Sequence, residues 1–470
     1  MIPPRLSPRP PELSCELLER YSTSAPRYTS YPTALDWEDA FEPASYPERL
    51  WRAADRPEPL SVYVHLPYCA ERCLFCGCNV VITRSEARME SYLDALAAEF
   101  GRVAAGGIGR RPVGQLHWGG GTPTHLSPRQ IERVQRAFGR GFQLAPDAEV
   151  SIEVDPRSCS PAQVARLAEL GFNRISVGVQ DFDPRVQAAV KRVQTESETR
   201  AVLDAARASG FRSVNVDLIY GLPHQTSETF GRTVERVLEL RPDRVALFHY
   251  AHVPWMKKHQ RALPGEALPA TREKLRIFVD ALEAFLRAGY AYLGLDHFAL
   301  PDDALAQAFD RGELHRNFMG YTTRGGGDLL GFGASSIGEV AGAYVQNAPA
   351  ERDYGASLAS GGLACARGHV LSADDRLRRD VILSILCNAR VDKAAIEAAH
   401  GVNFDATFAR EAEELAGMEA DGLLVQDPEA IRLTALGRLF LRNAAVPFDR
   451  YYRARRARGD DPGRRFSRTH

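Results

Sequence analysis

From about residue 60 the chain alternates between short apolar runs and longer amphipathic runs. Runs rich in β-branched and aromatic residues predict strands at 60–66, 114–120, 148–154, 174–180, 213–221, 244–250 and 291–298. Between them, apolar residues recur at the helical period and predict helices, as at 88–100, 160–171, 195–210, 226–240 and 271–289. This alternation is typical of βαβ units on a parallel sheet. We therefore expect an α/β fold, built as a partial or complete (β/α) barrel.

The pattern changes on both sides of the predicted barrel. Residues 1–57 are Pro-rich and predict an N-terminal arm, and residues 58–365 contain the barrel, with a Gly-rich stretch at 310–347 that we expect to be irregular. Residues 366–470 predict a smaller, mostly helical domain with a hairpin at 423–437 and a basic tail. A helical domain with a hairpin can be winged-helix-like, which leaves DNA binding or simple packing as its role.

Composition narrows the functional classes. The chain has 470 residues and a formal net charge of -1, which gives no general reason to expect nucleic acid or a membrane surface as a partner. The sequence holds no apolar run of the roughly 20 residues that a membrane span requires. The first residues have no apolar core of a secretory signal. We expect a cytoplasmic protein with reduced thiols.

Half of the 8 cysteines lie in one short stretch, "HLPYCAERCLFCGCN", residues 65–79. A disulfide knot conflicts with the expected compartment, which leaves a structural zinc loop or an iron–sulfur cluster. Three thiolates spaced C-x3-C-x2-C in one loop suit three irons of a [4Fe–4S] cluster and leave the fourth iron open to a small molecule. The expected ligands are Cys69, Cys73 and Cys76. Cys78 lies two residues past Cys76, too close to reach the remaining corner easily.

This spacing resembles the signature of the radical S-adenosylmethionine enzymes. "CLFCGCN" more narrowly resembles the oxygen-independent coproporphyrinogen III oxidases, also called coproporphyrinogen dehydrogenases. The likeness continues in family order through "PRYTSYPTALDWEDAF", "HWGGGTPT", "SIEVDPR", "GVQDF", "NVDLIYGLP", "YAHVP", "LHRNFMGYTTRGGGDLLGFGASSI" and "RRDVILSILCN". It implies the radical S-adenosylmethionine type of barrel, with the N-terminal extension and the smaller C-terminal domain.

The resemblance also implies the residues that contact S-adenosylmethionine. They are Tyr63, Phe75, Gly120, Gly121, Thr122, Glu153, Gln180, Arg192, Asp217, Ala251 and Ile337. Several fit on chemistry alone, because glycines allow close backbone approach, carboxylates and amides suit ribose hydroxyls and an ammonium group, and a guanidinium suits a carboxylate. Tyr63 is also the implied catalytic residue. The alternative for each is an ordinary structural role: a turn, a cap, a core position or a surface arginine.

The implied reaction converts coproporphyrinogen III to protoporphyrinogen IX, in haem biosynthesis, by oxidative decarboxylation of two propionates to vinyl groups without molecular oxygen. It implies a low-potential electron donor such as flavodoxin or ferredoxin, and we expect a monomer. Arg27 and the basic tail at 450–470 are candidate partners for propionates. The arm around Arg27 is expected to cover the macrocycle, or else to pack on the barrel. Two other functions remain open: a haem-binding chaperone and another radical tetrapyrrole-modifying enzyme.

Overall fold

The computed structural model describes residues 15–37, 41–460, 463 and 466. Its centre is one twelve-stranded sheet. The strand order is β16 (Cys365–Val370), β15 (Ala343–Asn347), β14 (Ile337–Val340), β13 (Leu329–Phe332), β1 (Leu60–Leu66), β4 (Val113–Gly120), β5 (Leu144–Val154), β6 (Arg174–Gln180), β7 (Ser213–Tyr220), β8 (Arg244–His249), β10 (His297–Ala299) and β9 (Ala291–Gly294). From β13 to β8 the neighbours are parallel. In the described residues the end strands β16 and β9 do not pair, so the barrel is partial.

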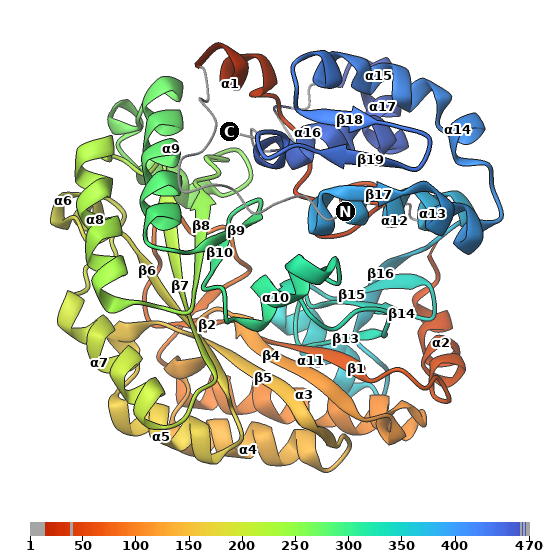
Figure 1. Cartoon of the computed structure of the whole chain (residues 1–470). Helices are drawn as coiled ribbons and strands as arrows, with labels where there is room; N and C mark the ends of the chain where they lie inside the picture. The colour runs from red at the N-terminus through yellow and green to blue at the C-terminus, as the bar shows by residue number, and fades with distance from the viewer. Residues whose placement is uncertain (1–14, 38–40, 461–462, 464–465, 467–470) are drawn as a thin grey trace.

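Helices cover the outer face of the parallel strands (Figure 1). They are α3 (Glu86–Ala105), α4 (Pro128–Gly139), α5 (Pro161–Glu169), α6 (Pro184–Ala189), α7 (Glu196–Ala208), α8 (Ser227–Leu240) and α9 (Thr271–Arg287). Most begin at a Ser or Thr whose side chain accepts a backbone N–H of the first turn, as Ser127 and Thr195 do in full capping boxes. The predicted strand–helix alternation is therefore confirmed.

Two sequence-based expectations were wrong in detail. The predicted strand at 291–298 is the hairpin β9–β10, because Gly294 and Leu295 adopt positive φ values of 125° and 52° and reverse the chain. The stretch 310–347, expected to be irregular, contains β11 (His315–Asn317), β12 (Gly320–Thr322) and β13 to β15. Its glycines permit close strand packing: a Cβ on Gly331 or Gly338 would lie 2.7 or 2.6 Å from the facing chain.

The remaining elements form the N-terminal arm, the loops and the C-terminal region. They are α1 (Cys15–Tyr21), α2 (Tyr46–Ala53), β2 (Tyr68–Cys69), β3 (Val81–Ile82), α10 (Ala304–Arg311), α11 (Glu351–Ala359), α12 (Ala373–Asn388), β17 (Arg390–Asp392), α13 (Lys393–His400), α14 (Phe404–Thr407), α15 (Ala409–Ala420), β18 (Leu424–Gln426), β19 (Ala430–Leu433), α16 (Leu441–Ala445) and α17 (Arg450–Ala457). Short 3-10 helices are η1 (Pro43–Ser45), η2 (Ile108–Arg110), η3 (Pro123–His125), η4 (Pro156–Ser158), η5 (Lys258–Ala262), η6 (Gly265–Ala267), η7 (Gly437–Phe440) and η8 (Val446–Phe448). The predicted hairpin at 423–437 is confirmed as β18–β19.

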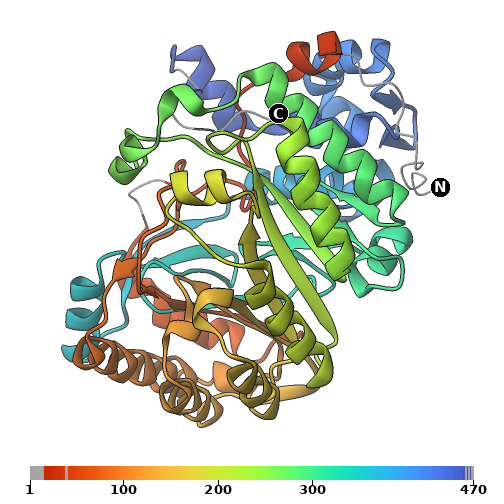
Figure 2. The same cartoon turned by 90° about the vertical axis from the view of Figure 1, so that its left-hand side faces the viewer.

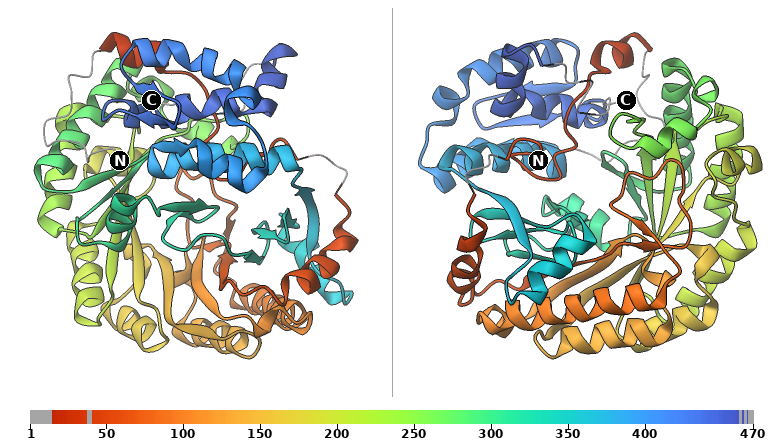
Figure 3. Two further views of the ribbon diagram at one scale, coloured as in Figure 1. Left: turned by 45° about the vertical axis from the view of Figure 1, so that its right-hand side comes forward. Right: turned by 180° about the vertical axis from the view of Figure 1, so that it is seen from behind.

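The N-terminal arm runs between the barrel and the C-terminal helices (Figure 3). Its backbone is held from the C-terminal side, where Arg442 Nε donates to Pro26 O at 3.1 Å and the Tyr452 hydroxyl donates to Ser24 O at 2.8 Å. Tyr28 and Tyr31 are each only 1% exposed. These two aromatic rings are thus part of the protein core, which gives no support to the expectation that they cover a macrocycle.

Figure 2 shows the C-terminal region, in blue, at one end of the molecule. The three-part division of the chain at residues 57 and 365 remains a proposal, and β16 crosses the second of these points while pairing in the large sheet. None of the helices in the described part of the chain combines the length and the apolar composition that a bilayer crossing requires.

Candidate active site

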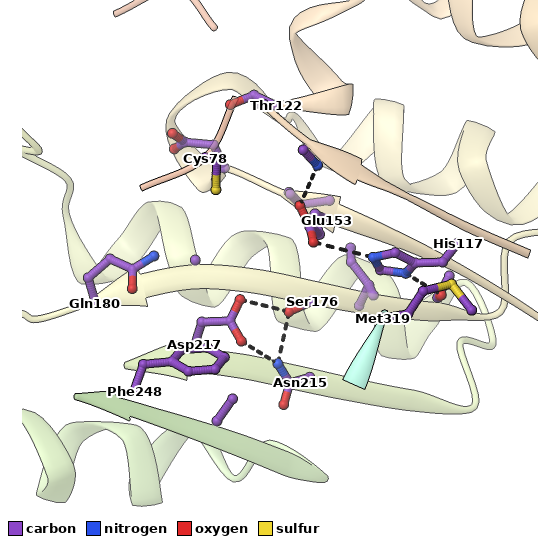
Figure 4. A pocket seen from close by; sticks show the side chains of 18 of the residues that line it. Cys78, His117, Thr122, Glu153, Ser176, Gln180, Asn215, Asp217, Phe248 and Met319 are labelled. Carbon is purple, nitrogen blue, oxygen red and sulfur yellow. Dashed lines mark hydrogen bonds and ion pairs between the residues drawn. The ribbon is translucent and has the colours of Figure 1, made fainter. Parts of the chain in front are cut away.

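One cavity of about 460 Å³ opens at the carboxyl ends of the parallel strands and extends along the inner face of the sheet. Polar side chains from several strands converge in it, as Figure 4 shows. Most of the residues predicted for the site line this cavity: Cys69, Cys73, Phe75, Cys76, Gly120, Gly121, Thr122, Glu153, Gln180, Arg192 and Asp217. The structure therefore brings together positions that are spread over 149 residues of sequence, from 69 to 217.

Three predicted residues lie outside the cavity lining. Tyr63 is separated from the cavity by the ring of His117, which lines the cavity and on which the Tyr63 ring stacks at a centroid distance of 5.9 Å. The Tyr63 hydroxyl lies 3.0 Å from His65 Nδ1. Ala251 is linked to the cysteine loop through Gln260, whose amide donates to both Ala251 O and Phe75 O. Ile337 is on β14, where it pairs with Gln346 across the strands.

The cysteine loop is fixed by contacts to its backbone. The Leu74 N–H donates to Val190 O at 2.9 Å, and Lys257 Nζ donates to Cys78 O at 3.3 Å. His259 Nε2 lies 2.8 Å from Cys76 O. Because these bonds use main-chain atoms, the thiols of the loop stay available for other partners.

Each predicted ligand thiol has a distinct environment. Cys69 Sγ lies 3.4 Å from the Thr122 hydroxyl, and burial raises the pKa of Cys69 to about 11. A hydrogen bond with Cys78 lowers the pKa of Cys76 to about 6. Cys73 Sγ lies 3.6 Å from Arg192 Nη1 and 3.8 Å from Arg157 Nη2. Two guanidinium groups beside one sulfur atom favour an anionic group bound there.

These features fit an iron–sulfur cluster. In the described residues no three His, Cys, Asp or Glu side chains converge as ligands of a single metal ion. A [4Fe–4S] cluster does not need such convergence, because each cysteine binds a different iron. Three thiols on one loop, two nearby cations and an adjoining cavity are the donor set and the space that the cluster and a fourth-iron ligand require.

The Gly-rich turn after β4 fits tightly against its own protein. A Cβ on Gly119 would lie 2.7 Å from the Glu153 carboxyl group, and one on Gly120 would lie 2.4 Å from the His65 ring. Gly120 also has a φ of 109°, which L side chains rarely adopt. These two glycines are therefore required by packing, and the turn places the Gly120 N–H 3.0 Å from Glu153 Oε2.

The cavity contains two acidic side chains in different states. Burial would raise the pKa of Glu153, but hydrogen bonds from His117 and the Gly120 amide outweigh it and the pKa is lowered. Burial and the charge of Glu153 raise the pKa of Asp217 to about 6. Asp217 accepts from Asn215 at 2.7 Å and from Ser176 at 3.0 Å (Figure 4).

Gln180 and Arg192 leave polar atoms without partners. Gln180 has a positive φ of 68°, and its buried Oε1 has no hydrogen-bond partner. Arg192 is 7% exposed, so it is no surface arginine: Nη1 contacts Asp155 at 2.8 Å, Nη2 donates to Gly178 O at 2.6 Å, and Nε has no partner. Buried polar atoms without partners are uncommon, and here they border the cavity, as expected for a site that binds a polar ligand.

Sequence reasoning missed several cavity residues: His117, Asp155, Arg157, Ser176, Asn215, Arg174, Arg244 and Met319. Strand alternation was the available signal for some of them. Ser176 lies two positions before Gly178, and Asn215 lies two positions before Asp217, so each faces the same side as its neighbour. Arg157 lies in the 3-10 helix η4 and Met319 in the turn between β11 and β12, for which alternation gives no guide.

Comparison with known proteins agrees with this geometry. Residues 63–237 match the model of the Radical SAM superfamily, and residues 371–440 match that of the HemN C-terminal domain. The partial barrel and the cysteine loop, taken with this match, define a radical S-adenosylmethionine enzyme. Its cofactors are therefore a [4Fe–4S] cluster and S-adenosylmethionine, and it is an oxidoreductase.

More similar relatives identify the family within this class. The chain is 46% identical to the oxygen-independent coproporphyrinogen III oxidase of Salmonella typhimurium over 437 residues, 93% of this chain and 95% of that protein. The same enzyme from Escherichia coli K12 gives the same identity and coverage. A solved structure of coproporphyrinogen III oxidase (HemN) from Escherichia coli matches with a TM-score of 0.87 and 45% identity, over 90% of this chain and 97% of that one. The chain belongs to the family of oxygen-independent coproporphyrinogen III oxidases.

Proposed function

We propose that this protein converts coproporphyrinogen III to protoporphyrinogen IX without molecular oxygen, as a step of haem and porphyrin biosynthesis. Two propionate side chains become vinyl groups, and each releases one carbon dioxide. The observation that carries the proposal is the cavity that the cysteine loop shares with Glu153, Gln180 and Asp217. The chain that forms it is 46% identical to an oxygen-independent coproporphyrinogen III oxidase. The haem-chaperone alternative gains no support from these relatives.

When bound, the cluster and S-adenosylmethionine supply a 5′-deoxyadenosyl radical, which removes a hydrogen atom from the β-carbon of a propionate. The propionate then loses carbon dioxide and gives one electron to an acceptor, which leaves the vinyl group. For two propionates, two hydrogen atoms, two electrons and two carbon dioxide molecules leave the substrate. The protein's own contribution is to position the reactants and to exclude water.

We assign the iron ligands to Cys69, Cys73 and Cys76. Their support is the three-thiol loop, fixed through its backbone, with the cations of Arg157 and Arg192 beside Cys73. Cys78 is assigned no iron. Its hydrogen bond with Cys76 lowers the pKa of Cys76 and so favours the thiolate form of that ligand.

The residues around the cavity are assigned to S-adenosylmethionine by their chemistry. Gly120, Gly121 and Thr122 offer backbone to the methionine end, and Arg192 offers its Nε edge to the methionine carboxylate. Glu153, Gln180 and Asp217 are acceptors for the ammonium and ribose hydroxyl groups. Phe75 is assigned to the adenine, and Ala251 and Ile337 are assigned weaker contacts, Ala251 through its link to Phe75.

Tyr63 is assigned a positioning role at the reacting centre. Burial raises the pKa of its phenol well above the usual value, so the group stays protonated and can donate its proton in a hydrogen bond. Its partner His65 is also buried, and burial lowers the pKa of His65, so this ring stays neutral. A neutral Tyr–His pair beside the cavity preserves geometry without adding charge.

We also propose a cytoplasmic monomer that receives electrons from an acidic low-potential carrier such as flavodoxin or ferredoxin. The support is the surface beside the cysteine loop, where Cys78 is exposed, Lys257 Nζ donates to Cys78 O, and the next residue along the chain, Lys258, is exposed. Cations beside the cluster loop favour an acidic partner. Replacing Lys258 by Glu is expected to slow flavodoxin-supported turnover while leaving dithionite-supported turnover intact, and equal effects on both would contradict the docking assignment.

The activity is tested by anaerobic reconstitution with iron and sulfide. The protein is then incubated with coproporphyrinogen III, S-adenosylmethionine and a reductant, and tetrapyrroles are identified by mass. We expect a product that has lost two carboxyl groups. Tight haem binding without any vinyl product would move the protein to the chaperone class.

A further inference from the structure

The cavity does not end at the cofactor residues. It continues along the inner face of the sheet toward the amino ends of the strands, where Arg174 and Arg244 line it together with Glu149 and Ser213. In the strand register Arg174 is beside Ser213, and Arg244 is beside Asn215. Asn215, the register partner of Arg244, donates to the cofactor residue Asp217. The two arginines therefore lie on the same inner face of the sheet as the cofactor residues, nearer the amino ends of the strands.

Each of these guanidinium groups is paired along only one edge. Arg174 Nε contacts Glu149 at 2.7 Å, and Arg244 Nε contacts Asp303 at 2.8 Å. Arg174 Nη1 and Arg244 Nη2 are buried without a hydrogen-bond partner, and the only further ion pair is Arg174 Nη1 to Asp303 at 3.8 Å in the described residues. The side chains keep 14% and 12% exposure inside a cavity, so part of each guanidinium side chain can be reached by a ligand.

Positive side chains outnumber negative ones around the two arginines. Asp303 is already used: it accepts from the Ser213 hydroxyl and caps α10 through the Leu305 N–H. Arg316 lies close by, with its guanidinium 5.1 Å above the Tyr321 ring, and no carboxylate among the described residues pairs with it. Tyr321 lines the cavity. Arg244 and Arg316 also lie near enough to His297 to lower its pKa, after burial, to about 4, so this ring adds no charge.

We propose that Arg174 and Arg244 bind a carboxylate of the substrate, a propionate other than the one that reacts. The inference rests on the proposed function and extends it to the substrate-holding residues. A propionate carboxylate accepts two N–H groups from a guanidinium, and the free Nη atoms are such donors. Asp217 and Ser213 are four residues apart on β7, about 13 Å at roughly 3.3 Å per residue. One macrocycle spans that interval, with one arm at the cofactor and another at the arginines.

The rival explanation is that these ion pairs only close the amino end of the barrel. The two explanations differ in substrate affinity, so the test is equilibrium dialysis under argon with reconstituted protein. The probes are coproporphyrinogen III and its neutral tetraamide. The variants are Arg174→Gln with Arg244→Gln, the single Arg244→Lys, and the control Arg311→Gln, whose exposed side chain pairs with Glu313 at the far end of α10.

We expect the double variant to bind coproporphyrinogen III about 10- to 100-fold more weakly, the range for losing charged hydrogen bonds. The tetraamide should bind the double variant and the unchanged protein equally. Arg244→Lys keeps the charge but loses the fork, so an intermediate affinity is expected. Arg311→Gln should match the unchanged protein. Iron content and melting temperature show whether each variant is folded.

Unchanged affinity of the double variant for coproporphyrinogen III would overturn the proposal, and so would an equal loss for the tetraamide. If the double variant does not fold, Arg244→Lys decides, and affinity equal to the unchanged protein counts against the proposal. The outcome is separate from the proposed function. Vinyl formation by the unchanged protein tests the function, whereas the ratio of affinities between probes tests the arginines.

Discussion

Asp217 and Glu153 share one cavity and titrate in opposite directions. Burial and the Glu153 charge raise the pKa of Asp217 to about 6, whereas the pKa of Glu153 is lowered by the hydrogen bonds from His117 and Gly120, which outweigh its burial. At neutral pH both are charged, but Asp217 is close to neutralisation. We expect the affinity for S-adenosylmethionine to fall as the pH falls from 7 to 5, because a protonated carboxyl group is a poorer acceptor.

The variant Asp217→Asn separates this titration from others. Its affinity should be weaker by about tenfold at pH 7, the usual effect of one charged hydrogen bond, and nearly flat between pH 7 and 5. The same variant tests stability. A raised carboxyl pKa favours folding at low pH, and this contribution is lost as the pH rises through 6. The unfolding free energy of Asp217→Asn, measured relative to the unchanged protein, should therefore be higher near pH 8 than near pH 3 by up to roughly 3 kcal/mol. An unchanged pH profile of affinity in the variant would contradict the assignment.

The cysteine assignments are tested by iron content. Cys69→Ala, Cys73→Ala and Cys76→Ala should each abolish a normal [4Fe–4S] spectrum, because each removes the only protein thiolate of one iron. Cys78→Ala should keep the cluster, and Cys159→Ala, which changes a buried thiol elsewhere, serves as the control. Loss of iron from the Cys78 variant, with iron retained in the Cys69 variant, would reverse the ligand assignment.

The Gly-rich turn offers a steric test. Gly120→Ala should lower both melting temperature and S-adenosylmethionine affinity, because the new Cβ would lie 2.4 Å from the His65 ring at a φ of 109°. Gly101→Ala is the matched control, since that Cβ meets nothing within 4 Å on α3 and Ala favours a helix by roughly 0.5–1 kcal/mol. Equal melting temperatures for the two variants would show that the turn tolerates a side chain.

The N-terminal arm is expected to be a structural element. Tyr31 is 1% exposed, and Tyr31→Ala should cost about 3–5 kcal/mol of unfolding free energy, as for other large buried aromatic residues. Leu35→Ala in the same arm is the control, because that side chain is 46% exposed. Chemical denaturation measures both. A small loss for Tyr31→Ala would restore the interpretation of the arm as a removable cover.

The substrate roles expected for Arg27 and the basic tail stay predictions, and residues 461–462, 464–465 and 467–470 of that tail lie outside the described residues. Arg27 pairs with Asp296 at 2.7 Å and lies 5.9 Å above the Phe248 ring, so one aromatic ring separates it from the cavity. In the tail, Arg450 pairs with Asp374 and Arg453 with Glu411, both within the C-terminal region. Arg174 and Arg244 are further candidates. Alternation places Arg174 on the same face of β6 as Ser176 and Gly178, but the sequence does not show that charged residues at the starts of strands line a cavity.

The parallel strands and the cofactor edge were predictable because short-range patterns determine them. Alternation in β6 and β7 places Gly178 and Asp217 on the inner face. The spacing of the three thiols predicts the cluster. The pairing of Arg192 with Asp155 was not predictable, since they lie 37 positions apart in the sequence and only the folded barrel brings them together. The same holds for the β9–β10 hairpin, which depends on two residues with positive φ.

The most direct test of the proposed function is to trace the hydrogen atom that leaves the propionate β-carbon. Coproporphyrinogen III with deuterium on the propionate β-carbons is incubated anaerobically with the reconstituted protein, S-adenosylmethionine and a reductant. Products are then analysed by mass. We predict a divinyl product that has lost two carboxyl groups, with deuterium recovered in 5′-deoxyadenosine. A folded, cluster-loaded protein that forms no vinyl product, or that forms it without transferring deuterium to 5′-deoxyadenosine, would contradict the proposed function.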